Sequence, residues 1–269
     1  SSSFILALAI VATFNTHAST PNTQQLKQTE DLLGKMVSFK TVKGNEQVPV
    51  MAEYLSTQLI QSGFAPEDVK IEHVAGTATL VARYRGNGSK KPMLISNHMD
   101  VVEAIPSDWT RDPFTMVKEE GYYFGRGVYD NKLDLALTMS TLRQLKKQGF
   151  KPSRDIVLVY SGDEETDMLS TKALSKQFPY AEFLLNGDGG GGSLSTDSTA
   201  VAYYLQTAEK TYADFNISIT NPGGHSSRPQ KDNAIYQLAA GLQKFSAYEF
   251  PVQSTEQTRA SFRFTGKQI

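Results

Sequence analysis

Six residues that can bind a metal ion or move a proton stand near the ends of predicted strands. They are His98, Asp100, Asp130, Glu164, Glu165 and Asp188. Open α/β sheets place their active sites at such strand ends. Imidazole and carboxylate groups are ligands that suit zinc, manganese or cobalt. The joint pattern therefore predicts a site for two divalent cations that activate a water at neutral pH, with one spare glutamate as a general base.

Each part of this pattern has an ordinary interpretation when it is taken alone. Residues 98–100 could form a plain loop, and Asp130 with its glycine neighbours could close a surface β-turn. Three adjacent acids at 163–165 repel one another unless a cation or solvent is near. The glycine run 189–192 is a flexible turn, because the sequence has neither a phosphate-binding Gly-Lys-Ser/Thr motif nor a dinucleotide fingerprint. The metal site is predicted from the combination.

The elements that must position these residues alternate between strands and helices. Amphipathic spacing predicts helices, and apolar or alternating runs predict strands. The predicted helices are 24–37, 48–62, 134–147 and 171–177, and the predicted strands are 69–74, 77–84, 93–96, 155–160 and 182–185. This alternation predicts an α/β fold with a mostly parallel sheet flanked by helices.

The pattern changes at about residue 207. A strand is predicted over 212–220, a helix over 233–245 and a strand over 259–264. This order indicates a smaller α+β domain. We therefore expect a first lobe over residues 19–206 and a second domain over residues 207–269.

Residues 1–18 have the pattern of a signal peptide whose start is missing. Residues 4–14 are uncharged and apolar, but this run is shorter than the roughly 20 residues that span a bilayer. Residues 16–18 offer small side chains at the positions a signal peptidase reads. A short buried helix or strand is the alternative. The pattern predicts export, to the periplasm or the exterior of a bacterial cell.

Composition excludes several classes of site and partner. The chain has 27 Lys and Arg against 28 Asp and Glu, so its net charge of −1 argues against a nucleic-acid partner. The absence of cysteine excludes disulfides, thiolate metal sites and cysteine nucleophiles. With four histidines in 269 residues, a metal site must depend mainly on carboxylates.

Five ordered blocks of the sequence resemble the M20 metallopeptidases. They are Ser96–Val102, Trp109 with Asp112–Phe114, Gly125–Lys132, Ser161–Glu165, and Gly223–Ser227 with Pro229. The family includes carboxypeptidases, dipeptidases, tripeptide aminopeptidases and aminoacylases. The resemblance implies hydrolysis of short peptides by an exopeptidase with two zinc ions, or with cobalt or manganese in their place. It also implies that residues 207–269 are part of an inserted lid through which the full-length protein forms a homodimer.

The resemblance assigns the metal ligands residue by residue. His98 and Asp188 resemble the ligands of one zinc ion, Glu165 resembles a ligand of the other, and Asp130 resembles the carboxylate that bridges both. The peptide bond between Asp130 and Asn131 is expected to be cis. Asp188 stands where deacylases of the family usually carry glutamate, which favours a peptidase.

The resemblance also assigns three catalytic positions. Asp100 resembles the acid that orients His98, and Glu164 resembles the general base that passes a proton to the leaving amine. His225 resembles the lid histidine that hydrogen-bonds the oxyanion of the tetrahedral intermediate. Leu133 departs from the family pattern, in which glycine is common at this position, so we expect this loop to pack differently.

The number of histidines predicts that the chain is truncated. The family uses two metal-binding histidines and a lid histidine, whereas His17 lies in the predicted signal peptide and His73 in a predicted strand. Only His98 and His225 match family positions. The late metal ligand is therefore expected beyond Ile269, and the chain as it stands is expected to bind at most one zinc tightly and to be inactive or weakly active.

Three alternatives remain open at this point. An N-acyl-amino-acid amidohydrolase has the same fold, and only a panel of substrates separates it from a peptidase. Zinc aminopeptidases of the same clan lack the lid, so the Gly223–His225 block argues against them. A non-catalytic relative that binds metal or peptide would have no use for a general base at Glu164.

Overall fold

The computed structural model describes residues 22–189, 191–197, 199–209 and 211–266 of the chain. It divides between residues 189 and 190 into two units, and each unit is described by itself. The predicted signal peptide, with His17, lies outside the described residues. The domain boundary expected after residue 206 stays a prediction.

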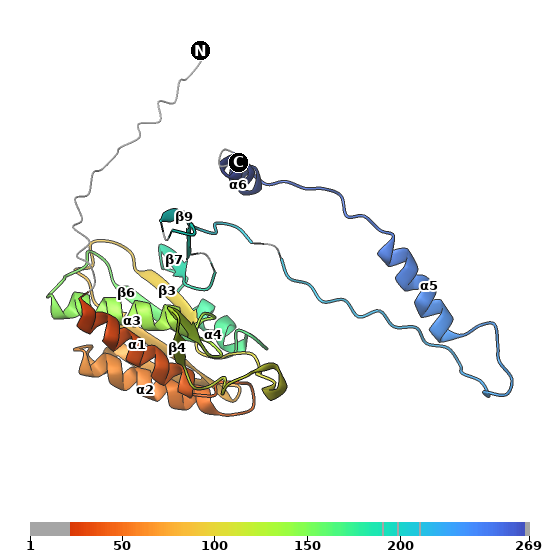
Figure 1. The fold of residues 1–269 in the computed structure, drawn as a ribbon, viewed down its shortest axis with the longest axis horizontal. Coiled ribbons are helices and arrows are strands. Elements are labelled where there is room, and N and C mark those ends of the chain that lie inside the picture. Colours follow the sequence, from red (N-terminus) through yellow and green to blue (C-terminus); the bar gives the residue numbers. More distant parts are fainter. Residues whose placement is uncertain (1–21, 190, 198, 210, 267–269) are drawn as a thin grey trace, which may run out of the picture. The chain divides into compact units, whose positions relative to one another are not determined.

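The first unit is built on a five-stranded sheet in the order β1-β2-β6-β3-β7, of which β3, β6 and β7 are labelled in Figure 1. The strands are β1 Val69–Val74, β2 Thr77–Tyr84, β3 Met93–His98, β6 Ile156–Ser161 and β7 Phe183–Asn186. Strand β3 runs parallel to β6 and β7, and β2 runs antiparallel to β1 and β6. Only β2 therefore opposes the common direction, and the predicted α/β fold with a mostly parallel sheet is confirmed. A separate short pair is formed by β4 Val117–Glu119 and β5 Tyr122–Phe124.

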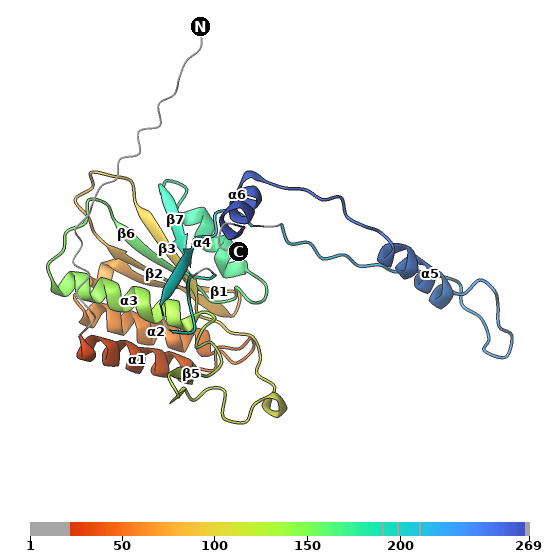
Figure 2. The same cartoon turned by 45° about the horizontal axis from the view of Figure 1, so that its top comes forward.

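Helices cover both faces of this sheet. Helices α1 Thr23–Ser38, α2 Gln47–Gln61 and α3 Lys132–Lys147 enclose the larger apolar core on one face (Figure 2), and α4 Leu169–Gln177 packs on the other. All six residues of β6 are buried between these layers. This burial explains why β6 reads as a continuous apolar run.

The start of α1 shows how local sequence sets an element's bounds. The side-chain oxygen of Asn22 accepts the backbone N–H of Gln24 at 2.7 Å and of Gln25 at 3.2 Å. The Gln25 side chain accepts the backbone N–H of Asn22 in return, at 3.2 Å, which completes a capping box. The helix therefore begins where the sequence supplies its cap.

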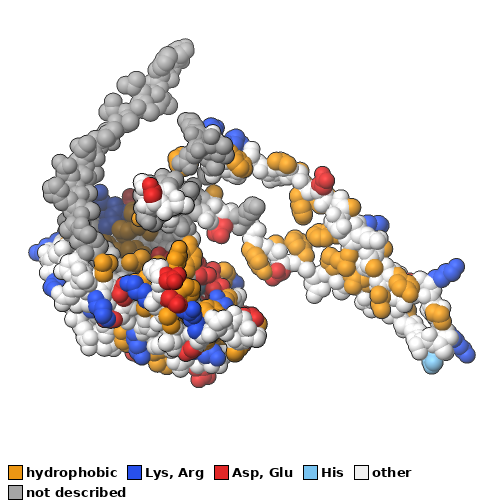
Figure 3. Space-filling view, in the orientation of Figure 1, with side chains coloured by type: hydrophobic (Ala, Val, Ile, Leu, Met, Phe, Trp, Pro, Cys, Tyr) orange, Lys and Arg blue, Asp and Glu red, His pale blue; other side chains and the backbone are white. Residues whose placement is uncertain are grey.

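The second unit contains a strand pair and two helices. They are β8 Gly191–Leu194, β9 Ala200–Tyr204, α5 Ala234–Ser246 and α6 Glu256–Thr265, with β8 antiparallel to β9. Helix α5 confirms the predicted helix over 233–245, and the Asn233 side chain caps it by accepting the Ile235 N–H at 2.8 Å. Apolar side chains gather along α5 in Figure 3, and Ile235, Tyr236 and Phe245 are all more than half exposed. No helix in the described part of the chain is both long and apolar enough to cross a membrane.

Two predicted strands of the second unit are wrong. Residues 212–220 carry alternating apolar side chains but form no regular element, and no described strand pairs with them. A strand needs such a partner to satisfy its backbone N–H and C=O groups. Residues 259–264 belong to α6, because the Thr255 hydroxyl caps the helix by accepting the Thr258 N–H at 3.2 Å.

Candidate metal centre

The carboxyl ends of β3, β6 and β7 lie side by side. In the parallel register, His98 at the end of β3 is opposite Ser161 at the end of β6, and Ser96 is opposite Asn186 at the end of β7. Glu164 and Glu165 follow β6 within four residues, and Asp188 follows β7 within two. Parallel pairing therefore places the polar residues that follow these strands at one edge of the sheet.

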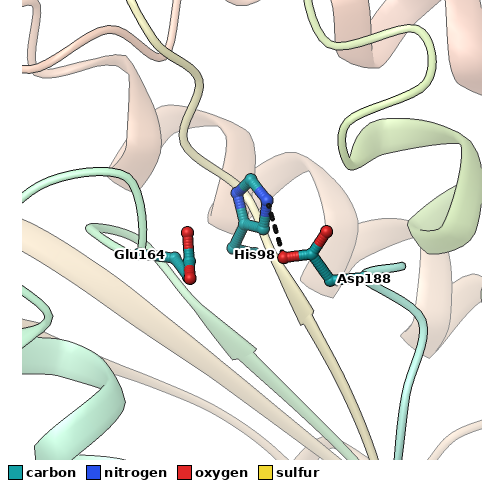
Figure 4. A group of neighbouring side chains, drawn as sticks. All are labelled: His98, Glu164 and Asp188. Atoms are coloured by element: carbon teal, nitrogen blue, oxygen red, sulfur yellow. Dashed lines mark ion pairs between the residues drawn. The ribbon is translucent and has the colours of Figure 1, made fainter. Parts of the chain in front are cut away.

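His98 is the centre of the group. Its side chain is 2% exposed, and its Nε2 lies 3.0 Å from Asp130 Oδ1 and 3.6 Å from Asp188 Oδ2. Figure 4 shows His98 between Asp188 and Glu164. The other ring nitrogen, Nδ1, lies 2.9 Å from the backbone oxygen of Asp100. A proton on Nδ1 would donate to this oxygen and leave Nε2 free to bind a metal ion.

The ligand atoms form two groups that share His98. One group is His98, Glu164 and Asp188, the other is His98, Asp130 and Glu165, and within each group the ligand atoms lie within 4.8 Å of one another. The structure thus brings together the four residues predicted as metal ligands and the predicted general base. Their chemical roles stay predictions.

Asp100 fixes the positions of both glutamates. Its carboxylate is buried, and it accepts the backbone N–H of Glu164 at 3.0 Å on one oxygen and that of Glu165 at 3.0 Å on the other. The same carboxylate lies 3.5 Å from His98 Nδ1. One buried acid therefore holds both the histidine and the glutamate loop in place.

The loop that carries Asp130 is held by tight backbone geometry. The peptide bond between Asp130 and Asn131 is cis, as the resemblance implied. Gly127 has φ +82°, and a Cβ atom there would lie 2.7 Å from Val101 Cγ1. Glycine is required at this position because a side chain would be strained and would clash.

Carboxylates outnumber basic groups at the site. Burial raises the pKa of Glu164, and the charges of Asp188, Asp100 and Asp130 raise it further against the opposing effect of His98. The pKa of Glu165 is raised in the same direction, first by burial and then by Asp130. The clustered carboxylates disfavour their own ionised forms.

His98 responds to the same imbalance. Burial lowers its pKa, but the hydrogen bond and charge of Asp100 and the charges of Asp188 and Asp130 outweigh burial and raise it to about 9. The cluster therefore favours a positive charge at its centre. One imidazole nitrogen among several carboxylate oxygens is also a suitable donor set, so the residues present fit a divalent metal ion.

Asp163 has a role that the sequence did not reveal. It is adjacent to Glu164, yet it is buried and turned toward the start of α4. Its carboxylate accepts the backbone N–H of Leu169 at 2.7 Å and of Ser170 at 3.0 Å, and it also accepts the Ser170 hydroxyl. Asp163 therefore caps a helix, and the expected repulsion among three adjacent acids is reduced. The local sequence offered no signal for this role, because Met168 occupies the N-cap position of α4 and Asp163 lies five residues before it.

The remaining predicted site residue, His225, lies in the second unit. It is exposed in a turn that follows Gly223, which has φ +80°. The backbone N–H of Ser227 donates to His225 Nδ1 at 3.2 Å, and the Ser227 hydroxyl lies 2.8 Å from the same atom. Its role at the oxyanion stays a prediction. His73 is exposed on β1 and has no contact with the four predicted ligands among the described interactions.

The sequence is similar to one peptidase family and to known members of related function. A family model described as peptidase family M20/M25/M40 matches residues 94–268. A probable carboxypeptidase S-like protein of Dictyostelium discoideum is 31% identical over 254 residues, which cover 88% of this chain and 48% of that protein. An N-fatty-acyl-amino acid synthase/hydrolase of Xenopus tropicalis is 25% identical over 244 residues, which cover 85% and 47%.

A solved structure of a dipeptidase from Saccharomyces cerevisiae has a similar fold. The alignment has a TM-score of 0.55 at 25% identity, and it covers 64% of this chain and 40% of the dipeptidase chain. The chain thus spans about half the length of the curated relatives it matches.

Proposed function

Because the chain belongs to peptidase family M20/M25/M40, we propose that the protein that carries it is a metal-dependent exopeptidase that hydrolyses short peptides. One observation supports this most strongly. His98 is shared by two clusters of acidic residues, and one of these clusters contains Glu164, which can act as a base. A peptidase of this kind needs both features in one place.

The residues at the sheet edge divide between two metal positions in this proposal. His98 and Asp188 would hold one zinc ion, Glu165 would hold the other, and Asp130 would contribute to both positions. Cobalt and manganese suit the same donors. When bound, such ions polarise the scissile carbonyl and lower the pKa of a water toward neutrality.

The protein's own groups move the proton and orient the ligands. Glu164 accepts a proton from the attacking water and passes it to the nitrogen of the leaving amine. Its raised pKa brings it closer to neutral pH, which suits a group that must both accept and release a proton. Asp100 keeps Glu164 and His98 in place through the contacts described above. The family resemblance assigns to His225 a hydrogen bond to the oxyanion, a contribution typically worth about 3–4 kcal/mol.

The second candidate is an N-acyl-amino-acid amidohydrolase. The relatives matched include a carboxypeptidase S-like protein and an N-fatty-acyl-amino acid synthase/hydrolase, and the breaking of an amide bond requires the same residues in both cases. A panel of dipeptides with free and blocked carboxyl ends, together with N-acyl amino acids, separates the two. Preferred cleavage of dipeptides with a free carboxyl end supports the exopeptidase.

Glu164→Gln tests the catalytic proposal in the protein that carries this chain. Loss of a general base should lower kcat by about 10²- to 10⁴-fold while bound metal, measured by atomic absorption, stays unchanged. Glu53→Gln, a change at an exposed glutamate on α2, is the matched control and should keep full activity. Unchanged turnover in Glu164→Gln would reject hydrolysis by this site.

The proposal extends to location and assembly. Export to the periplasm or the cell exterior is supported by the pattern of residues 1–18, and a homodimer through residues 207–269 is supported by the family resemblance. Cell fractionation tests the first. Light scattering on the purified full-length protein tests the second, and a monomeric mass would reject the dimer.

A further inference from the structure

Lys132 is the only buried lysine in the described part of the chain. Its side chain has no exposed surface, although it is the first residue of α3 and stands two positions after Asp130. Lysine is almost never fully buried without a partner. The partners here are the backbone oxygens of Met36, at 3.0 Å, and Phe39, at 2.8 Å. The side-chain nitrogen of Lys132 therefore lies at the carboxyl end of α1.

This end of α1 suits a cation. The last carbonyl groups of a helix lack partners within the helix, and they carry the negative end of its dipole. Helix α1 ends at Ser38, between the two oxygens that Lys132 contacts. The side chain thus links the end of α1 to the loop that precedes α3.

The same lysine closes the Asp130 loop at the backbone. Its N–H donates to the backbone oxygen of Gly127 at 3.0 Å. A Cβ atom on Gly127 would lie 3.1 Å from Lys132 Cδ, so the loop passes directly against the lysine side chain. Asp130 stands between these two attachment points.

The side chain of Asp130 has little support of its own. Glu164 and Glu165 are held by Asp100, whereas the Asp130 side chain is 56% exposed and its described hydrogen bond is to His98. The position of its carboxylate is therefore set mainly by its backbone. Lys132 fixes the backbone on the carboxyl side of Asp130 through the hydrogen bond of its N–H to Gly127.

We propose that Lys132 is a positioning residue whose link between the end of α1 and the Asp130 loop sets the affinity of the site for a divalent metal. The inference rests on the proposed function, because it assumes that Asp130 binds metal. A purely structural lysine would change the stability of the lobe and leave metal affinity alone.

These 269 residues contain no cysteine, so a cysteine introduced at position 132 is the only one among them and can be modified selectively. Lys132→Cys is alkylated in urea either with bromoethylamine, which rebuilds a lysine-like ammonium, or with iodoacetamide, which adds a neutral amide. Both forms are refolded, and their zinc affinity is measured by competition with a chromophoric chelator. Cobalt absorption spectra report the geometry of the site in each form.

The neutral form should bind zinc about 10- to 100-fold more weakly than the unaltered chain, as is typical when a residue that supports a ligand is lost. The ammonium form should recover most of the affinity and the unaltered cobalt spectrum. Met139→Ala, which removes a buried side chain elsewhere on α3, is the control. It should lower the melting temperature but keep zinc affinity within about twofold.

Three results would overturn the proposal. They are equal zinc affinity in both alkylated forms, a neutral form that does not fold, and a loss of affinity in Met139→Ala that matches that of the neutral form. The second result would assign Lys132 to folding of the lobe. If the unaltered protein that carries the chain binds no zinc, the proposed function itself fails, and that outcome is recognised before any variant is compared.

Discussion

Replacing Asp134 with asparagine should stabilise the metal-free chain. Asp134 lies in the first turn of α3, and a Cβ atom on Gly187 would come within 2.9 Å of Asp134 Cβ. Burial raises its pKa, and the charges of Asp188 and Asp130 raise it further, to about 6. The ionised form of Asp134 is therefore less stable in the folded chain than in the unfolded one.

The size of the effect follows from the pKa. A rise from 3.8 to about 6 corresponds to about 3 kcal/mol. The side chain is only half-buried, and solvent screening reduces this to about 1–2 kcal/mol. Because the folded state binds the proton more tightly, ionisation of Asp134 lowers stability as the pH rises from about 4 to about 6, and the loss is constant above that range. Asparagine does not ionise and avoids the loss.

Urea denaturation at pH 4 and pH 8 measures the difference. Asp134→Asn should be about 1–2 kcal/mol more stable than the unaltered chain at pH 8 and close to equal at pH 4. Zinc should reduce the advantage at pH 8, because a bound cation offsets the charges of Asp130 and Asp188. Asp108→Asn, at an exposed position, is the control. Its free energy of unfolding should match that of the unaltered chain at both pH values.

A lower stability of Asp134→Asn at pH 8 would refute this reasoning. It would mean that the favourable interaction of an acid with the first turn of α3 outweighs repulsion from the site. An equal gain at both pH values would also refute it, because the effect would then have no electrostatic origin.

Three further substitutions test the site and the core. Asp100→Asn should weaken zinc binding by about 10- to 100-fold in a chelator competition assay, since an amide is a poorer acceptor for the two N–H groups it holds. Gly187→Ala places a Cβ atom 2.2 Å from Asn97 Oδ1, so it should displace the adjacent Asp188 and weaken zinc binding in the same assay; unchanged affinity would contradict this. Leu55→Ala, at a fully buried position, should lower the free energy of unfolding by about 2–5 kcal/mol in urea, with zinc affinity unchanged.

The sequence predicted the first unit well because its elements are buried against one another. Strands β1 and β2 have the predicted bounds, 69–74 and 77–84, and β6 is buried along its whole length. Burial on one or both faces gives a strong periodic signal. In the second unit, residues 212–220 have the alternation of a strand without a described partner, so periodicity alone was misleading there.

The sequence predicted which residues gather at the site, but not which contacts each acid makes. Parallel strands bring their carboxyl ends together, so the grouping of His98 with Glu164, Glu165 and Asp188 followed from the fold class. Asp130 instead precedes α3, and its place in the group came from the family resemblance. The division of work among neighbouring acids did not follow. Asp163 and Glu164 are adjacent in sequence, yet one caps α4 and the other lies beside His98. The positions of backbone N–H groups decide this, and they are known only once the chain has folded.

The geometry of the site also links metal binding to the stability of the first unit. The acids around His98 raise one another's pKa, so the metal-free lobe holds unfavourable charge that a cation would offset. Binding at 100 times the dissociation constant would add about 2.7 kcal/mol to the stability of the folded state. Asp134→Asn removes part of the repulsion without a cation. Zinc should therefore stabilise this variant less than it stabilises the unaltered chain, and the difference measures how strongly Asp134 interacts with the metal centre.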